Sequence, residues 1–569
     1  MKDQKKYEVV ILGGGLAGLT LALQLKLSKP CLSILVLEKR KGDASIAKHK
    51  VGESTAELGS FYLREVLQLK AYLDKYQLPK YGFRLFFSQE HRDNIARRLE
   101  LGSRIQNPIP AHQIDRGIFE NEMVRRLSAK GVEVRLGATI KNVELSKGGH
   151  KICYEKTGSK YSLDATWIID STGRSSLLKR KLGLSKNLDH IINAAWFRLG
   201  SDIDINDWSD DEAWCNWVDP GRRRLSTNHL MGEGYWVWII PLISGNTSIG
   251  IVADPAFHPF EQFNTFEKAM KWLAINESLA AKMLGKHKKE LVDFKVMKHF
   301  SHDTKQLYST NRWGLTGDAG AFLDPFYSPG ADFLALNNSW LTELIIRDCN
   351  GENIALRTMI YEHAHRQLID GWILLYKSMY GLFGKTQIML VKVVWDWASY
   401  WGIPSLMFMN NGYTIIDVLK QYSATTDSIG QRFSKLNEQM QKLFLEWSNY
   451  DVKPCSDRQI NILGLDCLHQ FHRGLEKRYN PEDLIKKIDS NVKILEQVAA
   501  GILRLAFTHL KKTSLDMKID PYRMSLQDTR DELLEKSKGV HAFEVIESIK
   551  SDLAKVWLIS VKTKSEEYV

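Results

Sequence analysis

Apolar and polar positions at the start of the chain alternate in the order strand, turn, helix, strand. Residues 7–12 and 34–37 are apolar runs that fit buried strands, and residues 19–27 between them fit a helix. Two strands joined by a helix in this way form a right-handed βαβ unit. The beginning of the chain therefore predicts an α/β sheet that is covered by helices.

Later segments first extend this pattern and then replace it. Residues 186–300 mix short strands and helices. From about residue 335 the pattern is helical to the end of the chain, and Gly412 and residues 452–457 are candidate hinges. Between the βαβ unit and the mixed region we expect a helix over 53–76, a short strand over 83–87, a helix over 119–129, and strands of the first sheet over 132–136 and 167–169.

A glycine pattern joins the first strand to the helix. Gly13, Gly15 and Gly18 fit G-x-G-x-x-G, in which the glycines allow a tight turn, a close approach of a pyrophosphate and close packing of helix on strand. Glu38 ends the second strand, where a carboxylate accepts hydrogen bonds from ribose hydroxyls. This context favours a dinucleotide at the helix N-terminus over a glycine-rich turn without a ligand.

Three further segments resemble motifs of FAD enzymes of the aromatic hydroxylase and halogenase superfamily. In residues 313–320, which end in Gly-Asp-Ala-Gly, the resemblance implies that Asp318 binds the ribityl chain of FAD. Residues 113–116 resemble the element whose arginine, here Arg116, contacts the flavin, and residues 170–174 are similar to the Asp-Gly turn. Together with the first glycine pattern these motifs favour FAD over NAD, and we find no second dinucleotide motif for a nicotinamide.

Two segments resemble signatures of flavin-dependent halogenases. Residues 236–241 are similar to Trp-x-Trp-x-Ile-Pro, which implies that Trp236 and Trp238 keep the substrate off the flavin, although two core residues on one face of a strand would look the same. Residues 51–55 are similar to the Val-Gly-Glu-Ala/Ser-Thr segment, and Lys80 then matches the essential lysine. Its ammonium can polarise hypohalous acid, or its amine can form a haloamine; burial that lowers its pKa favours the amine.

Residues 324–333 resemble the halogenase loop that lies beside the flavin and holds the halide through backbone N–H groups. The resemblance implies that Pro325 and Gly330 lie at the flavin, and that the Ser328 hydroxyl and the Gly330 N–H bind the halide. Pro329 departs from the family because proline has no N–H to donate.

Tyr327 stands where tryptophan halogenases have a glutamate that stabilises the cation formed on an unactivated indole. Its absence argues against tryptophan and fits a ring with its own activation, such as a phenol or a pyrrole. The chain, over about residues 5–345, most resembles phenol-type halogenases or the halogenase-like proteins of aryl-polyene and flexirubin pathways, whose substrates ride on an acyl carrier protein.

The resemblance implies an enzyme that transfers chlorine or bromine to a phenol- or pyrrole-like ring, free or bound to a carrier protein. A separate flavin reductase would supply FADH2, and hypohalous acid made with O2 and halide would reach Lys80. Two alternatives stay open. One is a single-component flavin monooxygenase that hydroxylates an aromatic substrate with NADPH, and the other is a non-catalytic flavin-binding scaffold of a biosynthetic complex.

These motifs divide the predicted α/β fold into three parts. The last part, residues 346–569, has two interpretations. In the first it caps the active site with aromatic side chains, and tryptophans at helical spacing favour this interpretation. In the second its basic face docks a carrier protein or, less favoured, a membrane surface. The parts are a Rossmann-like FAD-binding domain (1–50, 108–185 and 300–345), a mixed-sheet substrate-covering domain (51–107 and 186–299) and a mostly helical C-terminal module (346–569).

Composition excludes several other classes of protein. The net charge of +11 is mild for 569 residues, and no Lys/Arg run resembles a nucleic-acid-binding arm. The six cysteines form no Cys-x-x-Cys pair, so we expect neither a zinc site nor dithiol chemistry. Scattered cysteines suit a reducing compartment, and we expect a cytoplasmic protein.

Overall fold

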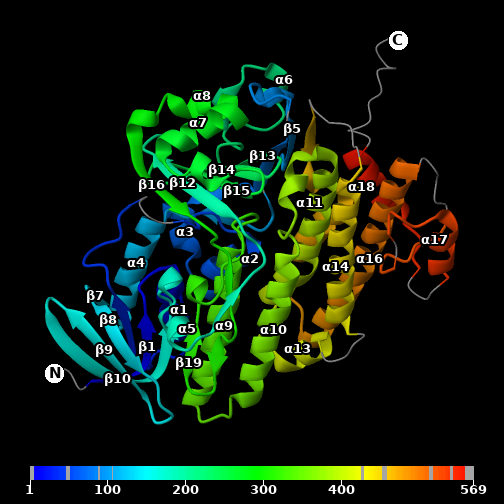
Figure 1. The fold of residues 1–569 in the computed structure, drawn as a ribbon. Coiled ribbons are helices and arrows are strands. Elements are labelled where there is room, and N and C mark those ends of the chain that lie inside the picture. The colour runs from blue at the N-terminus through cyan, green and yellow to red at the C-terminus, as the bar shows by residue number, and fades with distance from the viewer. Residues whose placement is uncertain are drawn as a thin grey trace.

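The structure is a computed structural model, and its three parts are seen in Figure 1. A sheet with flanking helices holds the N-terminus, a second sheet lies above it, and long helices of the C-terminal part run alongside both. The predicted α/β fold with a Rossmann-like part, a mixed sheet and a helical part is confirmed. The described residues are 5–46, 51–87, 90–105, 107–423, 428–450, 458–511, 517–523, 525–538 and 542–557.

The first sheet has the strand order β18-β19-β10-β1-β2-β7, with the antiparallel strands β8 and β9 joined to β10. β1 lies between β10 and β2 and is parallel to both, which confirms the predicted βαβ unit. Parallel strands are buried on both faces, and the last four residues of β1, Val9 to Leu12, are accordingly apolar and buried. The strands are β1 (Lys6–Leu12), β2 (Ile34–Glu38), β7 (Glu133–Leu136), β8 (Thr139–Glu144), β9 (His150–Lys156), β10 (Ser159–Asp170), β18 (Tyr308–Ser309) and β19 (Trp313–Leu315).

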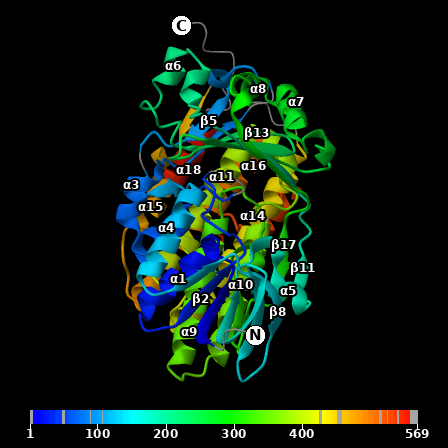
Figure 2. The same ribbon diagram turned by 90° about the vertical axis from the view of Figure 1, so that its left-hand side faces the viewer.

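Helix α1 (Leu16–Ser28) packs between α4 (Arg116–Ala129) and α9 (Gly330–Cys349), and these three helices cover the first sheet. Figure 2 looks onto α1 and α4. α1 begins directly after the glycine pattern, so its N-terminus lies at the carboxyl end of β1. In an open α/β sheet, ligands bind at that end of the strands.

The second sheet has the order β16-β12-β15-β14-β13-β4-β5-β20. Short strands β3 (Leu78–Lys80) and β6 (Ala111–Gln113) pair with each other below it, as do β11 (Ser185–Asn187) and β17 (His302–Thr304). The large sheet is built from β4 (Phe83–Phe87), β5 (Leu99–Gly102), β12 (Asn193–Leu199), β13 (Thr227–Gly232), β14 (Tyr235–Pro241), β15 (Thr247–Ala253), β16 (Leu291–Met297) and β20 (Gln459–Asn461).

The remaining described helices fall into three groups. Near the first sheet lie α2 (Glu57–Phe61), α3 (Lys70–Tyr76) and α5 (Leu177–Lys181). Near the second sheet lie α6 (Glu212–Cys215), α7 (Phe266–Asn276) and α8 (Ser278–Gly285). The C-terminal group comprises α10 (Ala355–Ile373), α11 (Thr386–Tyr400), α12 (Leu406–Met409), α13 (Ile416–Ser423), α14 (Ile429–Ser448), α15 (Asp466–Gly474), α16 (Pro481–Lys511), α17 (Arg530–Lys536) and α18 (Glu547–Trp557).

Two expectations about the C-terminal part were wrong in detail. Helical structure begins at Gly330 rather than near residue 335, and it does not continue unbroken. β20 interrupts it and pairs in parallel with β5, where the buried Ile460 lies opposite Leu101. Gly412 lies in the turn after α12, and residues 452–457 lie outside the described part of the chain. The predicted domain boundaries stay a prediction.

The helix expected over 53–76 is also divided. Residues 53–56 are extended, and Ser54 forms a bridge with Gln113 of β6. A π-helical turn at Tyr62–Val66 then separates α2 from α3. The extended stretch brings Glu53 against Arg198 of β12, which donates to it at 2.6 Å, and so joins residues 53–56 to the second sheet.

Within the described residues, no helix has the length and apolar character needed to cross a membrane. The same residues contain no group of three or more metal-ligating side chains. The cysteines that are described, Cys31, Cys153, Cys215, Cys349 and Cys467, are all free thiols.

Candidate functional site

The glycine turn after β1 has the geometry of a dinucleotide site. Gly13 has φ +109°, and a Cβ there would lie 2.5 Å from the Ser171 carbonyl oxygen, so only glycine fits. A Cβ on Gly18 would lie 2.2 Å from the Gly13 carbonyl oxygen, so glycine lets α1 approach the strand. Gly15, in contrast, faces open space. The backbone N–H of Gly14 donates to Glu38 Oε2 at 2.6 Å, which holds this carboxylate at the turn.

A cavity of about 600 Å³ opens from this turn and runs between the two sheets. A cavity of that size is in the range that takes a cofactor. It brings together most of the residues predicted for flavin, halide and the aromatic wall. These lining residues are Gly13, Gly15, Glu38, Arg116, Trp236, Trp238, Asp318, Pro325, Ser328 and Gly330.

Two observations fit FAD to this cavity. The N-terminus of α1 faces it through the open position at Gly15, where N–H groups are available to a pyrophosphate. Arg116 is held by the Val51 carbonyl oxygen and Glu120, yet its Nε is buried without a partner in the described part of the chain. A buried donor of this kind needs an acceptor, which bound FAD would supply.

The loop at residues 324–330 forms one side of the cavity and has a strained backbone. Tyr327 and Ser328 have φ values of +67° and +58°, which side chains other than glycine seldom adopt. Pro329 is the N-cap of α9, so the N–H of Gly330, the first residue of the helix, has no intrahelical acceptor. The arrangement leaves Gly330 N–H and the neighbouring Ser328 hydroxyl on the cavity side; their role toward halide stays a prediction.

The indoles of Trp236 and Trp238 form the opposite wall, with ring centroids 5.7 Å apart. Trp236 Nε1 donates to the Tyr380 hydroxyl at 3.1 Å, and that hydroxyl donates to Asp324 Oδ2 at 2.7 Å. Trp238 lies over Gly250 of β15, where a Cβ would come within 2.1 Å of the indole. Each tryptophan is therefore fixed by a neighbour that sequence reasoning did not single out.

Lys80 ends β3 and is only 3% exposed. Its Nζ donates to Ser54 Oγ at 2.9 Å and to the Thr55 carbonyl oxygen at 2.7 Å, and it lies 3.5 Å from the centre of the Phe83 ring. Burial lowers the pKa of this amine to about 7, although Glu57 and Asp332 oppose the shift. The side chain thus points inward and is not that of a solvated loop lysine.

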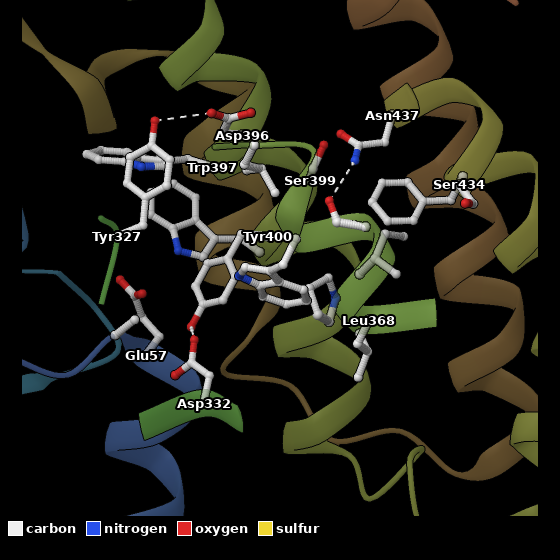
Figure 3. Close-up of a pocket in the computed structure, with 18 of the residues that line it drawn as sticks. Glu57, Tyr327, Asp332, Leu368, Asp396, Trp397, Ser399, Tyr400, Ser434 and Asn437 are labelled. Carbon is white, nitrogen blue, oxygen red and sulfur yellow. Dashed lines mark hydrogen bonds between the residues drawn. The ribbon is translucent and has the colours of Figure 1, made fainter. Parts of the chain in front are cut away.

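Figure 3 shows a second cavity, of about 120 Å³. Ser54, which accepts from Lys80, lines the first cavity, whereas Phe83, whose ring contacts Lys80, lines the second. Lys80 itself therefore lies in the partition between the two cavities.

The walls of the second cavity come from distant parts of the chain. Aromatic residues of α11 and the turn that follows it, Trp397, Tyr400 and Trp401, form much of the surface. α10, α13 and α14 complete it from the C-terminal part. The spacing of these aromatic residues on one helix was the only sequence signal for this cavity, and it did not identify which elements would meet there.

Three carboxylates line the second cavity, and two of them accept short hydrogen bonds from neighbouring protein groups. Asp332 accepts from the Tyr400 hydroxyl and from the Gly59 N–H, each at 2.8 Å, and burial raises its pKa to about 7. Asp396 accepts from Lys392, Gln441 and the Tyr327 hydroxyl. The third, Glu57, has weaker contacts and is considered below.

Comparisons with known proteins agree with this geometry. Residues 6–247 match the FAD binding domain family. The flavin-dependent halogenase chlA of Dictyostelium discoideum is 29% identical over 370 residues, which cover 60% of this chain and 60% of that protein, less than two thirds of its length. A 1H-pyrrole-2-carbonyl-(peptidyl-carrier protein) chlorinase of Pseudomonas fluorescens is 26% identical over 66% of this chain and 85% of its own.

Solved structures of halogenases share the fold. Halogenase PltM superimposes with a TM-score of 0.65 at 17% identity, over 86% of this chain and 97% of its own. The flavin-dependent brominase Bmp2 superimposes with a TM-score of 0.53 at 20% identity, over 66% and 87%.

Proposed function

We propose that this chain is a flavin-dependent halogenase that transfers chlorine or bromine to an electron-rich aromatic ring, in line with its FAD binding domain and its similarity to halogenase chlA. The position of Lys80 carries the proposal. Its buried amine lies in the partition between the cavity with the dinucleotide turn and a smaller aromatic cavity. An oxidant made in the first cavity can reach a ring in the second only past this partition.

The first cavity would hold FAD through the residues predicted for it. Gly13 and Gly15 would lie at the pyrophosphate, Glu38 at the ribose, and Arg116 and Asp318 toward the flavin end. Bound FADH2 would supply the electrons with which O2 and halide yield hypohalous acid. Ser328 and the Gly330 N–H would hold the halide beside it.

Lys80 would receive the halogen as an amine. At a pKa of about 7, roughly half of the side chain is uncharged at neutral pH. The amine attacks the halogen of hypohalous acid, which forms a nitrogen–halogen bond and releases water. The haloamine then gives its halogen to a ring carbon, and the proton lost from that carbon restores the amine.

The two tryptophans would separate substrate from flavin. Trp236 and Trp238 line the first cavity and are buried, so they fill the space that a ring would need to approach the cofactor directly. This arrangement favours halogenation through Lys80 over direct hydroxylation, the alternative suggested by the superfamily.

We propose a separate flavin reductase as a partner, because no second dinucleotide motif for a nicotinamide is found in the sequence. The substrate would be a free ring or one bound to a carrier protein. Relatives that act on a pyrrole carried by a peptidyl-carrier protein support the second form.

The experiment is product formation measured by mass spectrometry. The protein is incubated with FAD, a flavin reductase, NADH, chloride or bromide, and a panel of free and carrier-bound phenols and pyrroles. We expect a halogenated product from wild type and none from Lys80→Ala, with FAD binding retained in both. Rapid reduction of FAD by NADPH without a reductase, together with a hydroxylated product, would instead identify a single-component monooxygenase.

A further inference from the structure

Glu57 is the carboxylate of the second cavity that lacks strong partners. It is the first residue of α2 and is 5% exposed. His472 Nε2 lies 3.4 Å and Asn107 Nδ2 3.5 Å from the same oxygen, Oε1, and both distances are at the long limit for a hydrogen bond. No side chain in the described part of the chain donates to it at a shorter distance.

The charge on Glu57 is retained despite this weak pairing. Burial raises its pKa, but the neighbouring His472 and Lys80 outweigh that effect, so the pKa of Glu57 lies below its usual value. A buried carboxylate with only long hydrogen bonds is costly unless a further donor approaches it. Asp332 and Asp396, by contrast, already have short hydrogen bonds from the protein.

Other polar atoms of the same cavity also lack partners. Asn107 is 7% exposed, and its Oδ1 is buried with no hydrogen-bond partner among the described residues. Two more residues that line the cavity carry buried atoms without a hydrogen-bond partner among the described residues, namely Trp397 Nε1 and Ser399 Oγ. A polar ligand in this cavity would give these three buried atoms the partners that such atoms usually have.

The size and walls of the cavity limit what that ligand is. A cavity of about 150 Å³ with apolar walls takes a benzene molecule, so a cavity of about 120 Å³ takes one six-membered ring and excludes a bicyclic indole. Phe83 and Tyr400 provide aromatic surfaces for such a ring, and Glu57 lies with Asp332 at one end in Figure 3. The unpaired acceptors, Glu57 and Asn107 Oδ1, require donors on the ligand.

We propose that the second cavity binds a monocyclic hydroxyarene whose ring hydroxyls donate hydrogen bonds to Glu57 and to Asn107 Oδ1. The inference rests on the proposed function and deepens it, since it selects hydroxylated rings from the electron-rich aromatics. A ring hydroxyl that donates a hydrogen bond to a carboxylate also releases electron density into the ring. The ring carbon next to that hydroxyl then accepts halogen more readily. The carboxylate that acts on the hydroxyl comes from the first residue of α2.

The experiment measures binding rather than turnover. FAD-loaded protein is titrated calorimetrically with resorcinol, with phenol and with 1,3-dimethoxybenzene, which has no donor. We expect resorcinol to bind wild type at least about tenfold more tightly than dimethoxybenzene. Glu57→Gln, which keeps the shape of the side chain, should weaken resorcinol binding at least about tenfold and leave dimethoxybenzene unchanged. Glu65→Gln is the matched control, because Glu65 is exposed in the π-helical turn that follows α2.

A second variant keeps the test independent of how well Glu57→Gln folds. Asn107→Leu should remove the advantage of the second hydroxyl, so that resorcinol binds no more tightly than phenol. Equal binding of resorcinol to wild type and Glu57→Gln, or equal binding of resorcinol and dimethoxybenzene to wild type, overturns the inference. Product formation with unchanged binding in Glu57→Gln would refute this inference alone. If Glu57→Gln loses resorcinol binding but wild type forms no halogenated product, the proposed function is refuted instead.

Discussion

The two cavities of this protein are built in opposite ways. The first depends on backbone conformation at a short stretch of sequence, where Gly13, Gly15 and Gly18 join β1 to α1. The second depends on side chains that come from α2, β4, α10, α11, α13 and α14. A turn that depends on a few neighbouring glycines can be recognised in the sequence. A cavity lined by side chains from distant segments can be recognised only in the folded structure.

The largest effect should come from a substitution in the glycine turn between β1 and α1, and it should be on FAD affinity. Gly15→Val keeps an ordinary backbone conformation but places a branched side chain in the space that faces the cavity. We expect FAD affinity to fall more than about a hundredfold while the fold is retained, because the pyrophosphate can no longer approach the helix. Flavin fluorescence quenching measures this. Gly148→Val, at an exposed position with open space, is the control, and equal loss there would attribute the effect to folding.

The next effect should come from Lys80, and it should appear in how the rate of halogenation depends on pH. Because the pKa of Lys80 is lowered to about 7, its reactive amine fraction rises with pH up to that value and is constant above it. We expect single-turnover halogenation to increase about tenfold per pH unit below 7 and to level off above it. Lys75→Ala, at an exposed position, should show the same profile. A rate that decreases through pH 7 would mean that the ammonium is the active form.

Asp332 should affect stability rather than cofactor binding or turnover. Burial raises its pKa from 3.8 to about 7, so the native state keeps a proton that the unfolded chain loses. The stabilising contribution of this protonated group is complete below about pH 4 and is lost as pH rises through about 7, at most about 1.4 kcal/mol per pH unit. Denaturant unfolding of Asp332→Asn should lack this decline. The exposed variant Asp210→Asn should keep it; a decline that persists in Asp332→Asn would assign it to another group.

The smallest effect should come from the support of the indole wall. Tyr380→Phe removes the hydroxyl that accepts from Trp236 and donates to Asp324. Since Asp324 also has His190 as a partner at 2.8 Å, we expect a loss of only about 1 kcal/mol in the free energy of unfolding, with a few-fold lower rate of halogenation. Thermal unfolding and product formation measure both. Tyr76→Phe, whose ring is 46% exposed, should change neither.

The same contrast explains what the sequence could predict. The βαβ unit, the cofactor turn and the strand with Trp236 and Trp238 follow from local periodicity and spacing, and the structure brings these residues to one cavity. Lys80 was found by its similarity to a family motif, but its burial depends on Ser54 and Thr55, whose extended conformation was predicted as helix.

The second cavity was not predictable because its partners are separated by hundreds of residues. Glu57 and His472 meet only through tertiary packing, and neither residue alone differs from an ordinary surface residue in the sequence. Gly250 was missed for a similar reason, since its contact with the Trp238 indole arises from pairing of β14 with β15. Cross-strand neighbours of this kind are fixed by register, which a single sequence does not reveal.

The pairing of β20 with β5 has a consequence for how the polypeptide acquires its native state. Gln459 pairs with Glu100, so the sheet that carries the tryptophan wall has an open edge until the ribosome has made about four fifths of the chain. Contacts over such a distance are slow to form and leave partly folded chains prone to association. Newly made copies shorter than this point should therefore depend on chaperones, and the catalytic centre should assemble last.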